Sequence, residues 1–152
     1  MKALKDYFAA MEYPENLGTG KPSHPVFIRE NYYIGLCYEK LGKRDIAGRH
    51  YREAEKEKTG IASINSYYKA LALRKLGKEK DAERLLAEMK VRSEELIQQG
   101  RSVRSQYYLW ASMACYALGN EIQAKEYLVY AIELDPSYRW ATFFAYESGL
   151  FR

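Results

Sequence analysis

Residues 118–131 read LGNEIQAKEYLVYA, and this stretch decides the fold. Its Ala124, Leu128 and Ala131 are spaced i, i+4 and i+7, so they lie on one face of a helix. The Leu-Gly step before them predicts a turn, because glycine favours chain reversal at a helix end. A Leu-Gly step followed by such a triplet occurs twice more, with the triplets Ala47, Tyr51, Ala54 and Ala82, Leu86, Met89. Recurring helix–turn–helix units predict an all-α fold of antiparallel helix pairs.

The turn glycines set the lengths of the repeats. Gly42 and Gly77 are 35 residues apart, and Gly77 and Gly119 are 42 apart. Good helix formers fill the extra length, so the second helix of the middle repeat is expected to be long and to end near Gly100. The expected helix pairs span Phe27–Leu41 with Lys43–Glu57, Ser63–Leu76 with Lys78–Gln99, and Val103–Leu118 with Glu121–Leu134.

Each end of the chain carries half of a repeat. Ala3, Tyr7 and Ala10 show the i, i+4, i+7 spacing with no partner helix before them. At the other end, Asp135-Pro136 closes the third repeat and a last helix follows over 137–148. A helix without its partner leaves one face uncovered, so we expect the chain to be a piece of a longer array. The alternative is that the two end helices are caps of a self-sufficient domain.

The sequence thus predicts a single domain over 1–152. Three prolines and two glycines in the segment from Tyr13 to Pro25 exclude a regular helix there. The expected parts are a half-repeat helix over 1–13, a loop over 14–26, repeats over 27–59, 60–102 (with an extended second helix) and 103–136, and a C-terminal helix over 137–152.

The composition is that of a folded globular protein. The chain is 47% hydrophobic and 29% charged, which argues against disorder. Its net charge of +4 is smaller than a dedicated nucleic-acid binder usually carries. No apolar run is long enough for a membrane span, and the first residues do not form a signal peptide. Two cysteines without a Cys-x-x-Cys pair fit a cytoplasmic protein and are expected to be small buried apolar residues, with a disulfide between them as the alternative.

No motif in the chain predicts catalysis. The segment Gly18–Lys21 invites comparison with a phosphate loop, but Glu15 and Pro22 stand where that loop needs a glycine and a Ser or Thr. His24 and His50 have no further ligands at zinc-binding spacing. We therefore expect no catalytic centre, no cofactor and no metal, and we expect His50 to be a partly exposed helix residue.

The recurring pattern resembles the tetratricopeptide repeat. That repeat has a small residue in its first helix, a turn glycine, and a small, a large and a small residue in its second helix. The third repeat matches best, with Tyr108, Ser112, Gly119, Ala124, Leu128, Ala131 and Pro136. The first has Thr59 where a proline is usual, and the second has Met89 for alanine. The resemblance covers roughly 27–148 and implies a right-handed α-solenoid whose first helices line a concave groove.

The groove positions implied by the resemblance are mostly aromatic and apolar. Tyr32 and Leu36 stand where carboxylate-clamping repeats of this family carry Lys and Asn, so binding of a chaperone C-terminus is disfavoured. An apolar, aromatic contact with a protein or peptide is expected instead. The alternative is that these side chains pack between neighbouring helices. The candidate groove residues are Tyr32, Leu36, Tyr67, Leu71, Arg74, Trp110, Met113 and Tyr116.

A second resemblance concerns the leader Tyr13–Gly18, YPENLG. It is similar to the C-terminal repeat region of large bacterial proteins that carry a β-rich, carbohydrate-enzyme-like domain of unknown function.

Three functions follow as hypotheses. The first is a non-enzymatic scaffold that binds a protein, a peptide or the remainder of its parent chain. The second is an accessory repeat domain of a bacterial carbohydrate-active or carbohydrate-binding protein.

The third hypothesis, nucleic-acid binding, is disfavoured because acidic residues stand among the basic ones of the middle repeat. Glu79 and Arg84 lie close together, and Glu88 precedes Arg92 by one helical turn. We therefore expect a salt-bridged surface there. Self-association through the exposed chain ends is also expected, at Leu4, Tyr7 and Phe8 and at Trp140, Phe143 and Phe144.

Overall fold

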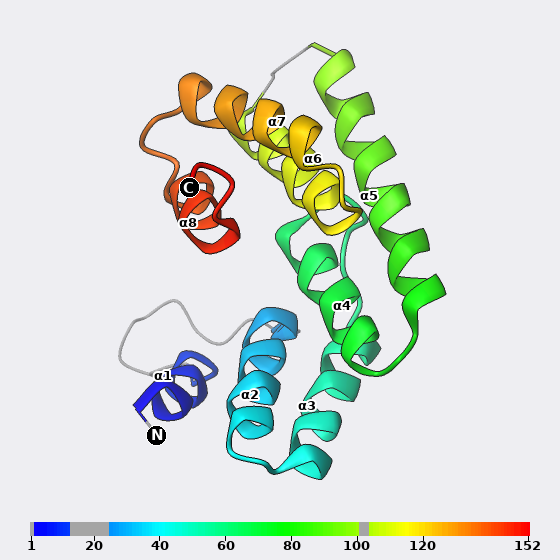
Figure 1. Cartoon of the computed structure of the whole chain (residues 1–152), viewed down its shortest axis with the longest axis vertical. Coiled ribbons are helices and arrows are strands. Elements are labelled where there is room, and N and C mark those ends of the chain that lie inside the picture. The colour runs from blue at the N-terminus through cyan, green and yellow to red at the C-terminus, as the bar shows by residue number, and fades with distance from the viewer. Residues whose placement is uncertain (1, 13–24, 101–103) are drawn as a thin grey trace. The chain divides into compact units, whose positions relative to one another are not determined.

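The computed structural model describes residues 2–12, 25–100 and 104–152, and within these ranges the chain forms eight helices and no strand (Figure 1). The predicted all-α class is confirmed. The predictions for 14–24, including the Gly18–Lys21 segment and His24, lie outside the described residues, as does the expected helix start at Val103. The helices are α1 Lys2–Ala10, α2 Ile28–Lys40, α3 Arg44–Lys56, α4 Ile64–Lys75, α5 Glu79–Gln98, α6 Ser105–Ala117, α7 Glu121–Leu134 and α8 Arg139–Ser148.

The helix bounds agree closely with the sequence pattern. The third repeat's second helix has the predicted limits, Glu121–Leu134, and α5 is the long helix expected in the middle repeat. The last helix begins two residues later than predicted. The side chain of Asp135 accepts hydrogen bonds from the backbone N–H (3.0 Å) and the hydroxyl (2.6 Å) of Ser137. This turn holds Ser137 outside α8.

The three turn glycines have the same conformation. Gly42, Gly77 and Gly119 have φ of 74°, 75° and 82°, the left-handed region that favours glycine. At the first turn, the N–H of Lys43 donates to the carbonyl of Tyr38 at 2.9 Å and the N–H of Gly42 to that of Glu39 at 3.0 Å. Equivalent pairs close the other two turns. This is the Schellman motif, and its recurrence makes the architecture repeat-like.

The triplets of the sequence pattern form the interior. All nine of their side chains are buried. In α2, Gly35 leaves room for Tyr51, because a Cβ atom there would lie 2.7 Å from Cδ1 of that ring. In α6, the hydroxyls of Ser105 and Ser112 donate to the carbonyls of Ala131 (2.6 Å) and Ala124 (2.7 Å) in α7. Small residues therefore let the two helices of a pair approach closely.

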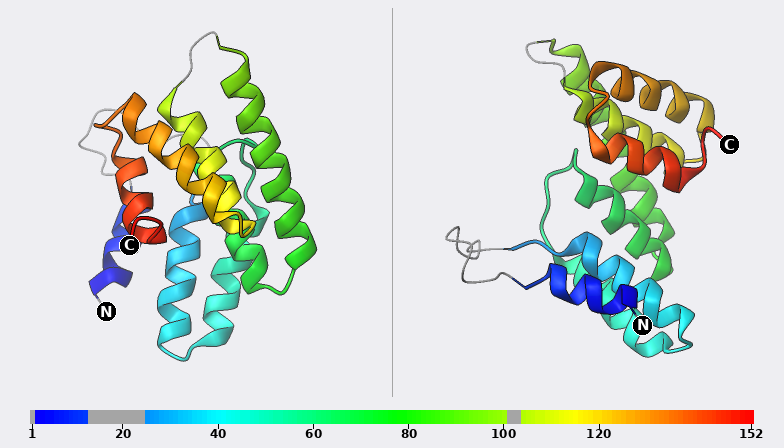
Figure 2. Two further views of the ribbon diagram at one scale, coloured as in Figure 1. Left: turned by 45° about the horizontal axis from the view of Figure 1, so that its top comes forward. Right: turned by 90° about the vertical axis from the view of Figure 1, so that its left-hand side faces the viewer.

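Contacts divide the chain into two compact units. The first comprises residues 1–59 and 68–82, and the second comprises 60–67 and 83–152. In the first, α2 packs against α3 and α1 packs against α2. In the second, α6 packs against α7, and α8 contacts both (Figure 2). The single domain and the right-handed solenoid stay predictions.

Candidate interaction site

Two of the groove candidates of the first unit, Tyr32 and Arg74, have partners within that unit. Tyr32 is half-buried, with its ring 5.7 Å from that of Tyr68 and 6.1 Å from that of Tyr51. Leu36 and Leu71 are half-buried as well. The Nε atom of Arg74 donates to the carboxylate of Glu79 at 2.8 Å. The positive charge of Arg74 is therefore already paired within the chain.

Glu39 is the centre of a second polar contact in the first unit. It accepts a hydrogen bond from the Tyr51 hydroxyl at 2.7 Å and one from the Lys75 ammonium at 2.9 Å. The bonds from Lys75 and Tyr51 lower the pKa of Glu39 below its ordinary range. Burial is the main cause that raises the pKa of Tyr51, followed by the bond to Glu39. The network joins α2, α3 and α4 within this unit.

In the second unit, α8 covers part of the predicted groove. Phe144 packs edge-on against Tyr67 (centroid distance 5.8 Å, interplanar angle 83°) and against Tyr116 (5.7 Å, 87°). The hydroxyl of Tyr116 also donates to the carbonyl of Ser148 at 3.2 Å. These contacts give the aromatic rings the edge-to-face geometry that stabilises buried pairs.

Two expectations about accessibility are wrong. Phe144, expected at an exposed end, is 2% exposed. Tyr67 and Met113, expected as groove anchors, are 6% and 2% exposed, so neither side chain is open to a partner. Trp110 is half-buried, and its Nε1 has no hydrogen-bond partner among the described residues. The expectation of exposure holds for Phe8 and Phe143, whereas Leu4, Tyr7 and Trp140 are half-buried.

Most of the exposed large apolar side chains of the second unit lie in its C-terminal part. Half of the twelve exposed large hydrophobic residues in the described ranges lie on or after α7. We call these six the C-terminal apolar surface: Ile122, Tyr130, Leu134, Phe143, Tyr146 and Phe151. Sequence reasoning missed it, although Ile122 and Tyr130 lie opposite the buried triplet of α7 and could have been found by that spacing.

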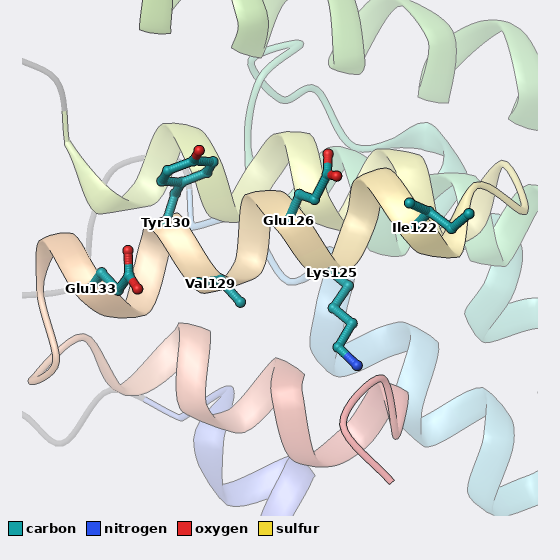
Figure 3. A pocket seen from close by; sticks show the side chains of 6 residues that line it. All are labelled: Ile122, Lys125, Glu126, Val129, Tyr130 and Glu133. Carbon is teal, nitrogen blue, oxygen red and sulfur yellow. The ribbon is translucent and has the colours of Figure 1, made fainter.

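One shallow pocket of about 450 Å³ lies on α7 (Figure 3). We call its lining the α7 face: Ile122, Lys125, Glu126, Val129, Tyr130 and Glu133. The ring of Tyr130 lies 5.5 Å from that of Tyr108 in α6, which supports it from below. The ammonium of Lys125 lies 5.2 Å from the centroid of Phe151. The face therefore combines apolar side chains with charges of both signs.

The charges of the α7 face differ from those of the middle repeat. In the described part of the chain, Lys125, Glu126 and Glu133 form no ion pair. The basic residues of α4, α5 and the turn between them are largely paired, which confirms the expected salt-bridged surface. The pairs are Arg74–Glu79, Lys75–Glu39, Lys78–Glu55, Lys90–Glu94 and Arg92–Glu95. Arg92 thus pairs with Glu95 rather than with Glu88.

The titratable side chains considered for chemistry have structural partners. His50 is half-buried as expected, with Nδ1 2.9 Å from Oδ1 of Asn31 and its ring stacked on Tyr38. Cys37 and Cys115 are free, and burial raises the pKa of the Cys115 thiol to about 11. Across residues 2–12, 25–100 and 104–152, no group of three or more His, Cys, Asp or Glu side chains could hold a metal ion. None of the helices in these ranges has the length and apolarity that a membrane span requires.

Comparison with known proteins finds no relative of this chain. The chain matches no protein-family model, no curated protein and no solved structure. Its class is therefore the one that the structure itself defines, an all-α chain of repeat-like helix pairs.

Proposed function

We propose that this chain is a non-enzymatic, tetratricopeptide-like module that binds a protein or peptide, including the remainder of its own parent chain. The observation that carries the proposal is the C-terminal apolar surface. Ile122 and Tyr146 are 79% and 74% exposed. Large apolar side chains that are exposed close together along the chain are candidates for protein contact, and aromatic side chains supply much of the energy of such contacts.

The proposed contact is apolar and aromatic. Arg74, the cation among the groove candidates, is paired with Glu79, and Tyr32 and Leu36 offer no cationic clamp. Affinity should therefore depend little on salt concentration, because few charges would be paired across the contact. The contact lies on α7 and α8 rather than at Tyr67 and Met113, since those two side chains are buried.

The test is capture of a partner by the immobilised chain, followed by measurement of affinity for that partner. Tyr146→Ala and Ile122→Ser should each weaken binding by about tenfold, the usual effect of removing an apolar anchor. Val91→Ser is the matched control, because Val91 is 55% exposed but lies on α5. If Lys80→Ala weakened binding while Tyr146→Ala and Ile122→Ser did not, the basic surface would replace the apolar one as the binding site.

A further inference from the structure

We propose that Tyr33 in α2 and Tyr68 in α4 are a modification site, at which one-electron oxidation joins the two phenol rings as dityrosine. Both residues belong to the first unit, so the site is independent of the function proposed for the C-terminal apolar surface of the second unit. Three observations carry the proposal: the hydrogen bond between the two hydroxyls, the side-by-side position of the two rings, and the contacts that connect the buried Tyr68 to half-buried tyrosines.

The geometry of the pair resembles that of the product. The hydroxyls of Tyr33 and Tyr68 are hydrogen-bonded at 3.1 Å, the ring centroids are 5.4 Å apart, and the ring planes are inclined by 53°. Rings that met only through the tips of their hydroxyls would lie much farther apart, so these two rings lie side by side. In dityrosine a bond joins the ring carbons next to the hydroxyl-bearing carbons, and the two hydroxyls are likewise neighbours on twisted rings. Reactants that are held in such an arrangement couple far more readily than free ones do.

Two other tyrosine pairs lack part of this geometry. The rings of Tyr7 and Tyr33 form a parallel stack, with centroids 5.1 Å apart and an interplanar angle of 3°, so their faces meet rather than their edges. In the second unit, the rings of Tyr108 and Tyr130 lie 5.5 Å apart, but within the described ranges no hydrogen bond joins their hydroxyls. The Tyr108–Tyr130 pair is therefore a matched control for ring proximity alone.

Ring contacts connect the buried member of the pair to tyrosines that an oxidant can reach. Tyr68 is 1% exposed, so a dissolved oxidant cannot touch its ring. Tyr7, Tyr32 and Tyr33 are half-buried, and no side chain of α1 is buried. The ring of Tyr7 stacks on that of Tyr33, and the ring of Tyr32 lies 5.5 Å from Tyr33 and 5.7 Å from Tyr68. Electrons pass readily between aromatic rings in contact, so oxidation of the outer tyrosines reaches Tyr68.

The reaction consumes two equivalents of a one-electron oxidant, such as a high-valent metal complex. Each phenol gives up one electron to the oxidant and its hydroxyl proton to water, and it becomes a neutral tyrosyl radical. The two radicals combine through the ring carbons next to their oxygens, which forms one C–C bond. Each of these carbons then loses its hydrogen as a proton while its oxygen takes one up, which restores both phenols. The net change is the loss of two electrons and two protons.

The link would tie α2 to α4 within the first unit. Tyr33 and Tyr68 are 35 positions apart in the sequence. A covalent bond between them restricts the unfolded chain in the way that a disulfide does, so the linked chain should unfold at a higher urea concentration than the unmodified one.

The test is oxidation of the whole chain by ruthenium(III) tris-bipyridine, generated with light and persulfate, in dilute solution so that links form within chains. Dityrosine is measured by its blue fluorescence, and mass spectrometry of the digested monomer identifies the joined residues. We expect a cross-linked peptide that joins Tyr33 to Tyr68 and has lost two hydrogen atoms. Tyr33→Phe and Tyr68→Phe keep the rings but remove one hydroxyl each, and both should lose this peptide and most of the monomer's fluorescence. Tyr7→Phe should slow the reaction, and Tyr130→Phe should leave the peptide unchanged.

Several results would overturn the proposal. The first is a wild-type monomer without dityrosine after its exposed tyrosines have been oxidised. The second is a link between Tyr7 and Tyr33 in place of the proposed one, because the stacked pair would then be the reactive pair. The third is an equal yield of a Tyr108–Tyr130 link, because ring proximity alone would then be sufficient. Oxidation in urea is the last control, since unfolding should remove the link between Tyr33 and Tyr68, and an equal yield there would show that the fold does not direct it.

Discussion

At the scale of single residues, two helical glycines have opposite roles. Gly35 in α2 faces the ring of Tyr51 so closely that a methyl group would overlap it. Gly48 in α3 has room, because the nearest atom to an added Cβ is the guanidinium of Arg52 at 3.5 Å. A glycine inside a helix lowers its stability relative to alanine, and only close packing that excludes a Cβ atom offsets this cost. Packing requires Gly35 and does not require Gly48.

Replacing each glycine by alanine should therefore change stability in opposite directions. Gly35→Ala should lower the free energy of unfolding by about 1–3 kcal/mol, because Tyr51 must move. Gly48→Ala should raise it by about 0.5–1 kcal/mol, because alanine favours the helix. Urea denaturation of the two variants measures both changes. Equal effects of the same sign would show that Tyr51 does not pack over Gly35.

His50 links stability to pH. Burial lowers its pKa below the ordinary value of 6.5, although the nearby Glu53 acts in the opposite direction. The unfolded chain therefore binds the proton more readily than the folded one does. The contribution of His50 to the free energy of unfolding is fully present above its ordinary pKa. It decreases as the pH falls from there towards the lower pKa of the folded state.

The free energy of unfolding should thus be lower at about pH 5.5 than at about pH 7.5, and His50→Gln should reduce that difference. Urea denaturation at the two pH values provides the measurement. His24 is common to both proteins, so its contribution cancels in the comparison. An unchanged pH difference in the variant would assign the effect to other groups.

At the scale of elements, α8 packs against its unit through a buried aromatic side chain. Phe144 lies between Tyr67 and Tyr116, whereas Phe143, its neighbour in sequence, is 43% exposed. Adjacent positions on a helix point about 100° apart, so one ring enters the interior and the other faces solvent. The same residue type is therefore structural at one position and available for contact at the next.

Truncation of these two rings should separate the roles. Phe144→Ala should cost about 3–5 kcal/mol of stability, the usual range for a buried phenylalanine. Phe143→Ala should cost less than about 1 kcal/mol, because it loses mainly an edge contact with Trp140. Thermal and urea unfolding of both variants provide the test. Equal losses would place Phe143 in the interior too.

At the scale of the whole molecule, the chain has two compact units, each with its own buried triplet. Ala47 belongs to the first unit and Ala124 to the second, and both are buried where two helices of a pair approach. A bulky side chain at either position cannot fit without displacing a helix. The loss of helix packing should be greatest within the unit that carries the substitution, since contacts are denser within a unit than outside it.

Ala47→Trp should therefore lower amide protection in α2 and α3 more than in α6 and α7, and Ala124→Trp should do the opposite. Hydrogen exchange read by mass spectrometry resolves the two regions. Gly48→Ala, which disturbs no helix contact, is the control for the first variant. Uniform loss of protection along the chain would show that the molecule unfolds as one cooperative unit.

The sequence by itself determined the elements and the interior of each helix pair. Helix periodicity and turn glycines are local properties, so α7 could be delimited to the residue and the triplets could be assigned to the core. Only the tertiary structure decided which aromatic side chains are accessible. Tyr67 and Met113 are buried, and the exposed apolar surface lies on α7 and α8 instead. Accessibility depends on which distant helix packs over a residue, and Phe144 is 77 positions from Tyr67 in the sequence. No local pattern encodes a contact of that range, because it follows from the assembled helices.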